Sequence, residues 1–135
     1  MKVLVMGLPG SGKTTLCKLL KIEFNCAWFN ADAVRNMAND WDFSPAARLR
    51  QASRMRHLCD FESGSGKIVL CDFVCPTEKT REIFGADFTI WMNTIEFGRY
   101  EDTNSMFQPN HNANLTITKL NYDWRLVADI VRDAN

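Results

Sequence analysis

The sequence predicts an α/β domain, a three-layer fold in which helices cover both faces of a five-stranded, mostly parallel sheet. Short apolar segments alternate with helical patterns along all 135 residues. Three of those segments are apolar at consecutive positions, which is typical of strands buried on both faces in a parallel sheet. Because no linker, repeat or low-complexity segment divides the chain, we expect a single domain over residues 1–135.

Each expected strand is a short apolar segment bounded by turn or polar residues. The segment KVLVMG has four apolar residues in a row and ends in glycine. The segments KIVLCDFVC and ADFTIWMN are apolar over most of their length, whereas CAWFN is shorter and LTITKL is weaker. We therefore expect strands over residues 2–7, 26–30, 67–75, 86–93 and 115–120.

Apolar periodicity and capping residues define the expected helices. Residues 14–24 carry a leucine-rich stripe. Ser44 is a favourable N-cap, Pro45 suits the first helical position, and the glycines of 64–66 end that helix. We expect helices over 14–24, 32–37, 45–63, 76–84 and after Asp123, where Leu126, Val127, Ile130 and Val131 would face inward, and a short lid loop with at most a helical turn over 93–114.

The overall composition is neutral, with 16 basic and 16 acidic residues. This balance disfavours nucleic acid or a membrane surface as a partner, since both attract a basic excess. The cysteine count of five is odd and no CxxC occurs, so we interpret the cysteines as small core residues in a reducing cytosol. No signal peptide and no apolar run of membrane length is evident, so we expect a cytoplasmic protein, and a homodimer is compatible with the sequence.

The strongest motif is GLPGSGKT at residues 7–14, which matches G-x-x-x-x-G-K-[ST]. It follows a predicted strand and opens a predicted helix, the context in which backbone N–H groups surround phosphate oxygens. A glycine-rich turn with a chance Lys-Thr pair is the alternative, and the context disfavours it. Lys13 is expected to bridge phosphates during catalysis, and the expected ATP-binding residues of this loop are Leu8, Pro9, Gly10, Ser11, Gly12, Lys13, Thr14 and Thr15.

The motif alone indicates a nucleoside triphosphate site and leaves the class of protein open. A GTPase of the common type needs a guanine-reading NKxD segment, and none is present. A motor domain of 135 residues would be unusually small. A compact P-loop kinase with ATP and Mg²⁺ as its cofactors fits the length best.

Asp32, Arg35 and Asp72 follow the second and third expected strands and would converge at the sheet edge that carries the phosphate loop. We expect Asp32 to orient or deprotonate an acceptor hydroxyl, and Arg35 to hold an anionic group of a small-molecule acceptor. A surface ion pair between these two residues is the alternative. Asp72 is expected to hold Mg²⁺ together with Thr14, with a strand-end cap as the alternative.

Two further arginines are candidates. Arg48 shares a helical stripe with apolar Ala52 and Met55, and a cation there is costly unless it meets an anion, so it should point into a cleft. Arg99 lies in the expected lid loop, where it would close over the transferred phosphate, although a surface arginine explains it nearly as well.

Four segments resemble the adenylylsulfate kinase family. GLPGSGKTT is similar to its phosphate loop and NADAVR resembles its Asp-Gly-Asp-Asn-x-Arg segment. FSPAARLRQ resembles Phe-Ser-x-x-x-Arg-x-x-Asn, and DFVCP stands where the family has Ser-Phe-Ile-Ser-Pro. The resemblance implies transfer of the ATP γ-phosphate to the 3′-hydroxyl of adenosine 5′-phosphosulfate. It implies an acceptor site in which Phe43 stacks on the adenine and Arg35 and Arg48 hold the phosphosulfate, with Gln51 and Phe73 at further matching substrate-binding positions.

The chain departs from the family pattern at several positions. Asn30 replaces an Asp, Gln51 replaces an Asn, and Asp72 replaces a Ser. A shorter segment replaces the lysine-rich lid of the family, and this shortened chain resembles virus-encoded members. Two alternatives therefore stay open. One is a kinase for a nucleotide or polynucleotide 5′-hydroxyl, and the other is a nucleotide-binding module without turnover.

Overall fold

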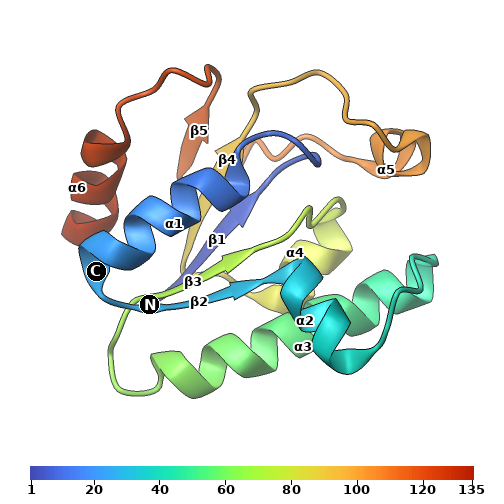
Figure 1. Ribbon diagram of the computed structural model, residues 1–135, viewed down its shortest axis with the longest axis horizontal. Helices are drawn as coiled ribbons and strands as arrows, with labels where there is room; N and C mark the ends of the chain where they lie inside the picture. Colours follow the sequence, from blue (N-terminus) through green and yellow to red (C-terminus); the bar gives the residue numbers. More distant parts are fainter.

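The computed structural model describes residues 1–135 and contains one sheet of five strands in the order β2-β3-β1-β4-β5 (Figure 1). All neighbouring strands pair in parallel, which confirms the predicted fold class. The strand that leads into the phosphate loop lies at the centre of the sheet. The strands are β1 (Lys2–Met6), β2 (Ala27–Asn30), β3 (Val69–Asp72), β4 (Phe88–Met92) and β5 (Leu115–Ile117).

Helices cover both faces of the sheet (Figure 1). Because side chains alternate along a strand, β1 sends Val3 and Val5 to one face and Leu4 and Met6 to the other, where they join separate apolar clusters. The first cluster includes residues of α1 (Lys13–Phe24) and α6 (Trp124–Ala134), and the second includes residues of α2 (Ala31–Ala38), α3 (Pro45–Ser63) and α4 (Glu78–Phe84). No helix combines the length and the apolar composition that a membrane span requires.

Side-chain caps explain where several helices begin. The Asn30 side chain accepts a hydrogen bond from the Ala33 N–H at 3.0 Å, so α2 begins directly after β2. Ser44 caps α3 as expected, with Pro45 at the first helical position. Asp123 caps α6 by accepting from two backbone N–H groups. The second strand therefore runs without a loop into the helix that carries Asp32.

The structure differs from the sequence prediction in several places. β5 ends at Ile117 rather than at residue 120, and α4 begins at Glu78 rather than at residue 76. β3 ends at Asp72 rather than at residue 75, because its neighbours β1 and β2 end at Met6 and Asn30 and offer no further ladder. The segment 93–114 contains the short helix α5 (Glu101–Met106). Leu126 is 56% exposed, since α6 is buried along Val127, Ala128 and Val131 instead.

Candidate active site

A cavity of about 540 Å³ lies at the carboxyl ends of β1, β2 and β3, in the size range of small-molecule sites. Ligands of open α/β sheets bind at this edge. The cavity brings together the phosphate loop, the start of α2, the end of β3, the start of α3 and the region of α5. Its lining residues are Pro9, Gly10, Lys13, Thr14, Asn30, Ala31, Asp32, Trp41, Phe43, Arg48, Asp72, Phe73, Val74, Arg99, Tyr100, Asp102 and Thr103.

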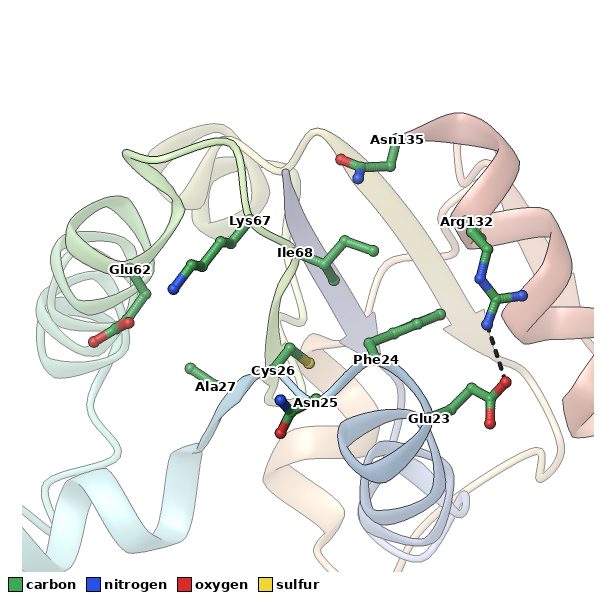
Figure 2. Close-up of a pocket in the computed structure, with 10 residues that line it drawn as sticks. All are labelled: Glu23, Phe24, Asn25, Cys26, Ala27, Glu62, Lys67, Ile68, Arg132 and Asn135. Carbon is green, nitrogen blue, oxygen red and sulfur yellow. Dashed lines mark hydrogen bonds and ion pairs between the residues drawn. The ribbon is translucent and has the colours of Figure 1, made fainter.

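A second cavity, of about 550 Å³, lies at the opposite edge, beside the amino ends of β2 and β3 (Figure 2). Its charged side chains include Glu23 and Arg132, which pair with each other at 3.0 Å. Its one cysteine, Cys26, has its pKa raised to about 11 by burial, so the thiol stays protonated at neutral pH. Because this edge carries neither the phosphate loop nor an activated nucleophile, the first cavity is the candidate active site.

The phosphate loop joins β1 to α1 and depends on glycine for its shape. A Cβ on Gly7 would lie 2.7 Å from the Met92 carbonyl oxygen, and Gly12 adopts a φ of +97° at the start of α1. Lys13 Nζ donates to the Leu8 carbonyl at 3.0 Å, so the cation lies across the loop. Burial lowers the pKa of Lys13, and the charges of Asp72 and Asp32 oppose this shift.

The structure places the predicted ATP-binding residues in two groups. Pro9, Gly10, Lys13, Thr14 and Arg99 line the cavity, as predicted. The others lie outside the lining: Leu8 and Ser11 are buried, Gly12 packs near Leu120, and Thr15 is exposed on α1. A loop of this kind binds anions through backbone N–H groups. The side-chain positions of Leu8, Ser11, Gly12 and Thr15 therefore do not decide whether these residues contact phosphate.

Asp72 is buried, with 2% of its surface exposed, at the end of β3. Its two oxygens accept hydrogen bonds from Trp28 Nε1 at 2.9 Å and from Asn30 Nδ2 at 2.8 Å. Burial raises the pKa of Asp72, and the Trp28 bond, the Lys13 charge and the Asn30 bond oppose that rise. Sequence reasoning missed Trp28 and Asn30 as functional residues, although their spacing of two places both on one face of the expected second strand.

Asp32 lies in the first turn of α2 with an exposed side chain and lines the cavity together with Asn30 and Ala31. It forms no ion pair with Arg35, so the alternative of a surface pair between them is not observed. Its carboxylate is free to accept a proton or a hydrogen bond from a molecule in the cavity.

The wall opposite the phosphate loop is aromatic and carries one central cation. Arg48 Nε donates to the Phe43 carbonyl at 2.9 Å, and its Nη2 donates to Thr103 Oγ1 at 3.3 Å. Burial lowers the pKa of Arg48, and the charge of Asp102 opposes this. Arg48, Phe43 and Phe73 therefore lie in the cavity as predicted. Sequence reasoning missed several lining residues. Trp41, Tyr100, Asp102 and Thr103 are among them, because they lie in segments without a period.

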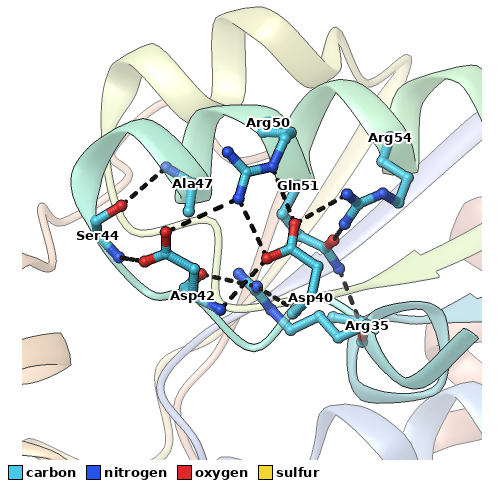
Figure 3. Close-up of polar contacts among 9 residues, drawn as sticks. Arg35, Asp40, Asp42, Ser44, Ala47, Arg50, Gln51 and Arg54 are labelled. Carbon is cyan, nitrogen blue, oxygen red and sulfur yellow. Dashed lines mark hydrogen bonds and ion pairs between the residues drawn. The ribbon is translucent and has the colours of Figure 1, made fainter. Parts of the chain in front are cut away.

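Arg35 and Gln51, predicted as substrate ligands, do not line the cavity and instead contact the chain around it (Figure 3). The buried Arg35 donates from Nη1 to the carbonyls of Asp40 and Asp42, both at 3.0 Å. Gln51 is also buried, and its Nε2 donates to the Ala31 carbonyl at 3.2 Å. Both side chains are occupied by the backbone around the site, so they shape it from behind.

The residues around the phosphate loop fit a magnesium ion. Thr14 offers a hydroxyl and Asp72 a carboxylate in the same cavity, and Mg²⁺ prefers such oxygen ligands. No group of three His, Cys, Asp or Glu side chains forms a metal centre made of protein alone. Mg²⁺ in phosphotransferases is usually held by one or two protein groups and by the phosphates of the substrate, which matches this arrangement.

Known proteins that are similar to this chain in sequence or fold are kinases, in agreement with the phosphate loop in the cavity. A probable adenylyl-sulfate kinase of Aeropyrum pernix is 33% identical over 87 residues, which are 60% of this chain and 48% of that protein. The chain thus spans about half of this relative. The adenylylsulfate kinase of Mycobacterium tuberculosis, solved with AMPPNP and APS, superposes with a TM-score of 0.81 over 98% of this chain and 95% of that one, at 22% identity.

The fold is also similar to that of kinases with other names. Shikimate kinase of Acinetobacter baumannii, solved with shikimate, gives a TM-score of 0.65 at 15% identity over 98% of this chain and 90% of that one. The fold alone therefore does not specify an acceptor. The model of one family, adenylylsulphate kinase, matches residues 1–103. The chain belongs to the adenylylsulphate kinase family of P-loop phosphotransferases.

Proposed function

We propose that the protein transfers the γ-phosphate of ATP, with Mg²⁺, to a hydroxyl of a small anionic acceptor, and that the best candidate is the 3′-hydroxyl of adenosine 5′-phosphosulfate. One observation carries the proposal. A single cavity joins Lys13 and Thr14 of the phosphate loop to Asp32 and to an opposite wall that holds Phe43 and Arg48. Donor and acceptor would thus meet beside a carboxylate.

On the donor side, the loop N–H groups and Lys13 would hold the β- and γ-phosphates. Thr14 and Asp72 would hold Mg²⁺, which neutralises charge on the transferred group when it is bound. Arg99 lines the same cavity and would contact the phosphoryl group from the lid side. Together these groups supply positive charge where the transition state needs it.

On the acceptor side, Asp32 would accept the proton of the attacking hydroxyl or orient that hydroxyl toward the phosphate. Phe43 offers a flat face to an aromatic base, and Arg48 offers a cation to an anionic group. Asp102 lines the same cavity, so the acceptor side carries an acid beside the Arg48 cation. A cytoplasmic location, which the free thiols favour, belongs to the same proposal.

The test is an acceptor panel with ADP release as the readout, headed by adenosine 5′-phosphosulfate and including adenosine, a nucleotide and an oligonucleotide with a free 5′-hydroxyl. Asp32→Asn should lower turnover with the preferred acceptor by about 100-fold or more, because general-base catalysis typically contributes that much, and should leave ATP affinity unchanged. Asp133→Asn, an exposed acid on α6, is the matched control and should behave as wild type.

Two results would contradict the proposal. If Asp32→Asn keeps full turnover, Asp32 has another role. If no acceptor on the panel stimulates ADP release, the chain is a nucleotide-binding module instead. Preferential use of the oligonucleotide, with an affinity that falls steeply with salt, would favour the polynucleotide alternative.

A further inference from the structure

Asn30 and Asp72 face each other across the pairing of β2 with β3. They are register partners in the parallel ladder, and Asn30 Nδ2 donates to Asp72 Oδ1 at 2.8 Å. Trp28, two residues earlier on the same face of β2, donates from Nε1 to Asp72 Oδ2 at 2.9 Å. Each oxygen of the carboxylate therefore receives one hydrogen bond from the neighbouring strand.

These two donors fix the Asp72 carboxylate without neutralising it. A carboxylate this buried is costly unless it is hydrogen-bonded, and both donors are neutral groups on a rigid strand. Each carboxylate oxygen accepts more than one hydrogen bond, so both keep an acceptor site for a further partner. Lys13 does not occupy those sites, because its Nζ donates to the Leu8 carbonyl. Asp72 is thus held in a fixed orientation with free acceptor capacity beside the phosphate loop.

The Asn30 amide is itself oriented by the fold. Its Oδ1 accepts from the Ala33 N–H at 3.0 Å as the cap of α2, and this turns Nδ2 toward Asp72. A carboxylate at position 30 would cap the helix equally well, but it would face the Asp72 carboxylate across the ladder. Two ionised carboxylates are both acceptors and form no hydrogen bond with each other, so this contact favours one acid and one neutral donor.

The family segments that this chain resembles have an acid at the position of Asn30 and a serine at the position of Asp72. The present chain has the amide at the first position and the acid at the second. Both arrangements place one carboxylate in the pair, on β2 in one case and on β3 in the other. In this chain, the two positions that depart from the family segments are in direct contact.

We propose that positions 30 and 72 form a unit with one carboxylate, in which Asn30 and Trp28 are positioning residues for Asp72. The acid of the magnesium site has moved from β2 to β3, and either strand is able to supply it. The inference rests on the proposed function only in that Asp72 serves Mg²⁺. It predicts that an acid at position 30 restores what is lost when Asp72 is neutralised.

The experiment measures ATP affinity by calorimetry, with and without Mg²⁺, so that it does not depend on turnover. Asp72→Asn should reduce the Mg²⁺-dependent gain in ATP affinity by about tenfold or more, the size expected when a group at a metal site is removed. The double variant Asn30→Asp/Asp72→Asn should recover that gain to within about threefold of wild type, on the same scale. Affinity for metal-free ATP should not follow this pattern of loss and recovery.

The matched control is Asn36→Asp/Asp72→Asn, because Asn36 is an exposed residue of the same helix α2 and gives the same net charge without facing position 72. It should remain as weak as Asp72→Asn alone. Trp28→Phe keeps an aromatic ring at this position and removes the indole N–H donor. It should lower only the Mg²⁺-dependent gain in ATP affinity. If Asp72→Asn does not fold, as judged by circular dichroism, Asp72→Ser and its double variant with Asn30→Asp replace it.

Three outcomes would overturn the inference. The first is a Mg²⁺-dependent gain in ATP affinity for Asn30→Asp/Asp72→Asn that is no larger than that of Asp72→Asn alone. The second is an equal recovery of this gain by Asn36→Asp/Asp72→Asn, which would show that net charge alone explains the effect. The third is a wild-type protein whose ATP affinity does not respond to Mg²⁺. Failure of the acceptor panel, with Mg²⁺-dependent ATP binding and paired recovery intact, would contradict the proposed function and leave this inference standing.

Discussion

Arg35 shows how a residue outside the cavity controls a residue inside it. Its guanidinium carbon lies 4.4 Å from the centre of the Phe43 ring, and Arg48 lies at 5.5 Å from the same centre. Arg35 also holds the Asp40 and Asp42 carbonyls, so it fixes the backbone that leads to Phe43. The planar fork of arginine makes these contacts together, and lysine cannot.

We therefore predict that Arg35→Lys raises KM for the acceptor by about tenfold, the size expected for loss of a charge-assisted hydrogen bond and a cation–π contact. KM for ATP should stay unchanged. Steady-state kinetics with each substrate varied in turn measures both. Arg50→Lys, on an exposed side chain of the same loop network, is the control, and an equal effect in the control would contradict the special role of Arg35.

How much of the site the sequence predicted depends on the kind of segment. Lys13, Thr14 and Asp72 all line the cavity, because the phosphate loop and the end of β3 lie at the carboxyl edge of a parallel sheet. Arg35 was predicted at the acceptor because it lies one turn from Asp32. Helical spacing predicts which side of the helix a residue lies on, but not how far its side chain reaches. The carbonyls that accept hydrogen bonds from Arg35 belong to a later loop. Trp41 lies in that loop, where the sequence has no helical or strand periodicity from which its position could be predicted.

At the scale of elements, the segment around α5 is attached to the phosphate loop. Thr94 Oγ1 donates to the Ser11 carbonyl at 2.7 Å, and Gly98 approaches so closely that a Cβ there would lie 2.9 Å from the Pro9 carbonyl oxygen. Asn104 accepts from the Gly98 N–H at 2.7 Å and donates to the Gly98 carbonyl at 2.9 Å. One side chain therefore holds both the N–H and the carbonyl of Gly98, the residue that precedes Arg99.

From this geometry we predict that Asn104→Ala lowers kcat by about fivefold to tenfold, because net losses of about one kcal/mol are typical for removed hydrogen bonds. The same change in an Arg99→Ala background should add little, since Asn104 would act through Arg99. Amide hydrogen exchange over residues 94–104 should also accelerate. Asn112→Ala, an exposed control, should change neither readout; additive effects of Asn104→Ala and Arg99→Ala would show that the two residues act separately.

At the scale of the whole molecule, the junction between α2 and α3 depends on one carboxylate (Figure 3). Asp40 accepts from Arg50 and Arg54, at 2.9 Å to each. The hydrogen bond from Arg50, followed by that from Arg54, holds the pKa of Asp40 well below its usual range. A lowered pKa means that the ionised form stabilises the fold above the unfolded pKa of about 4, and that this stabilisation is lost as the pH falls further.

The stability of the protein should accordingly show an acid-sensitive component that belongs to Asp40. Asp40→Asn should lower Tm at pH 6 to 7, and the difference from wild type should shrink steadily below about pH 4, because the unfolded chain takes up a proton at Asp40 there while the folded carboxylate stays ionised to lower pH. Thermal unfolding followed by circular dichroism across this range measures it. Asp129→Asn, on exposed α6, should give a small difference at every pH, and a constant difference for Asp40→Asn would contradict the assignment.

The order of the strands also has a consequence for how the chain folds. β1 lies at the centre of the sheet, yet its partners β3 and β4 follow only after α1, β2, α2 and α3 in the sequence. The apolar strand that carries the phosphate loop therefore has no partner until β3 is complete at Asp72, and it lacks its second partner until β4 is complete at Met92. Contacts between distant residues slow folding, and unpaired apolar strands promote aggregation. The feature that places Lys13 at the centre of the active edge thus makes the nascent protein dependent on protection until β4 has been made.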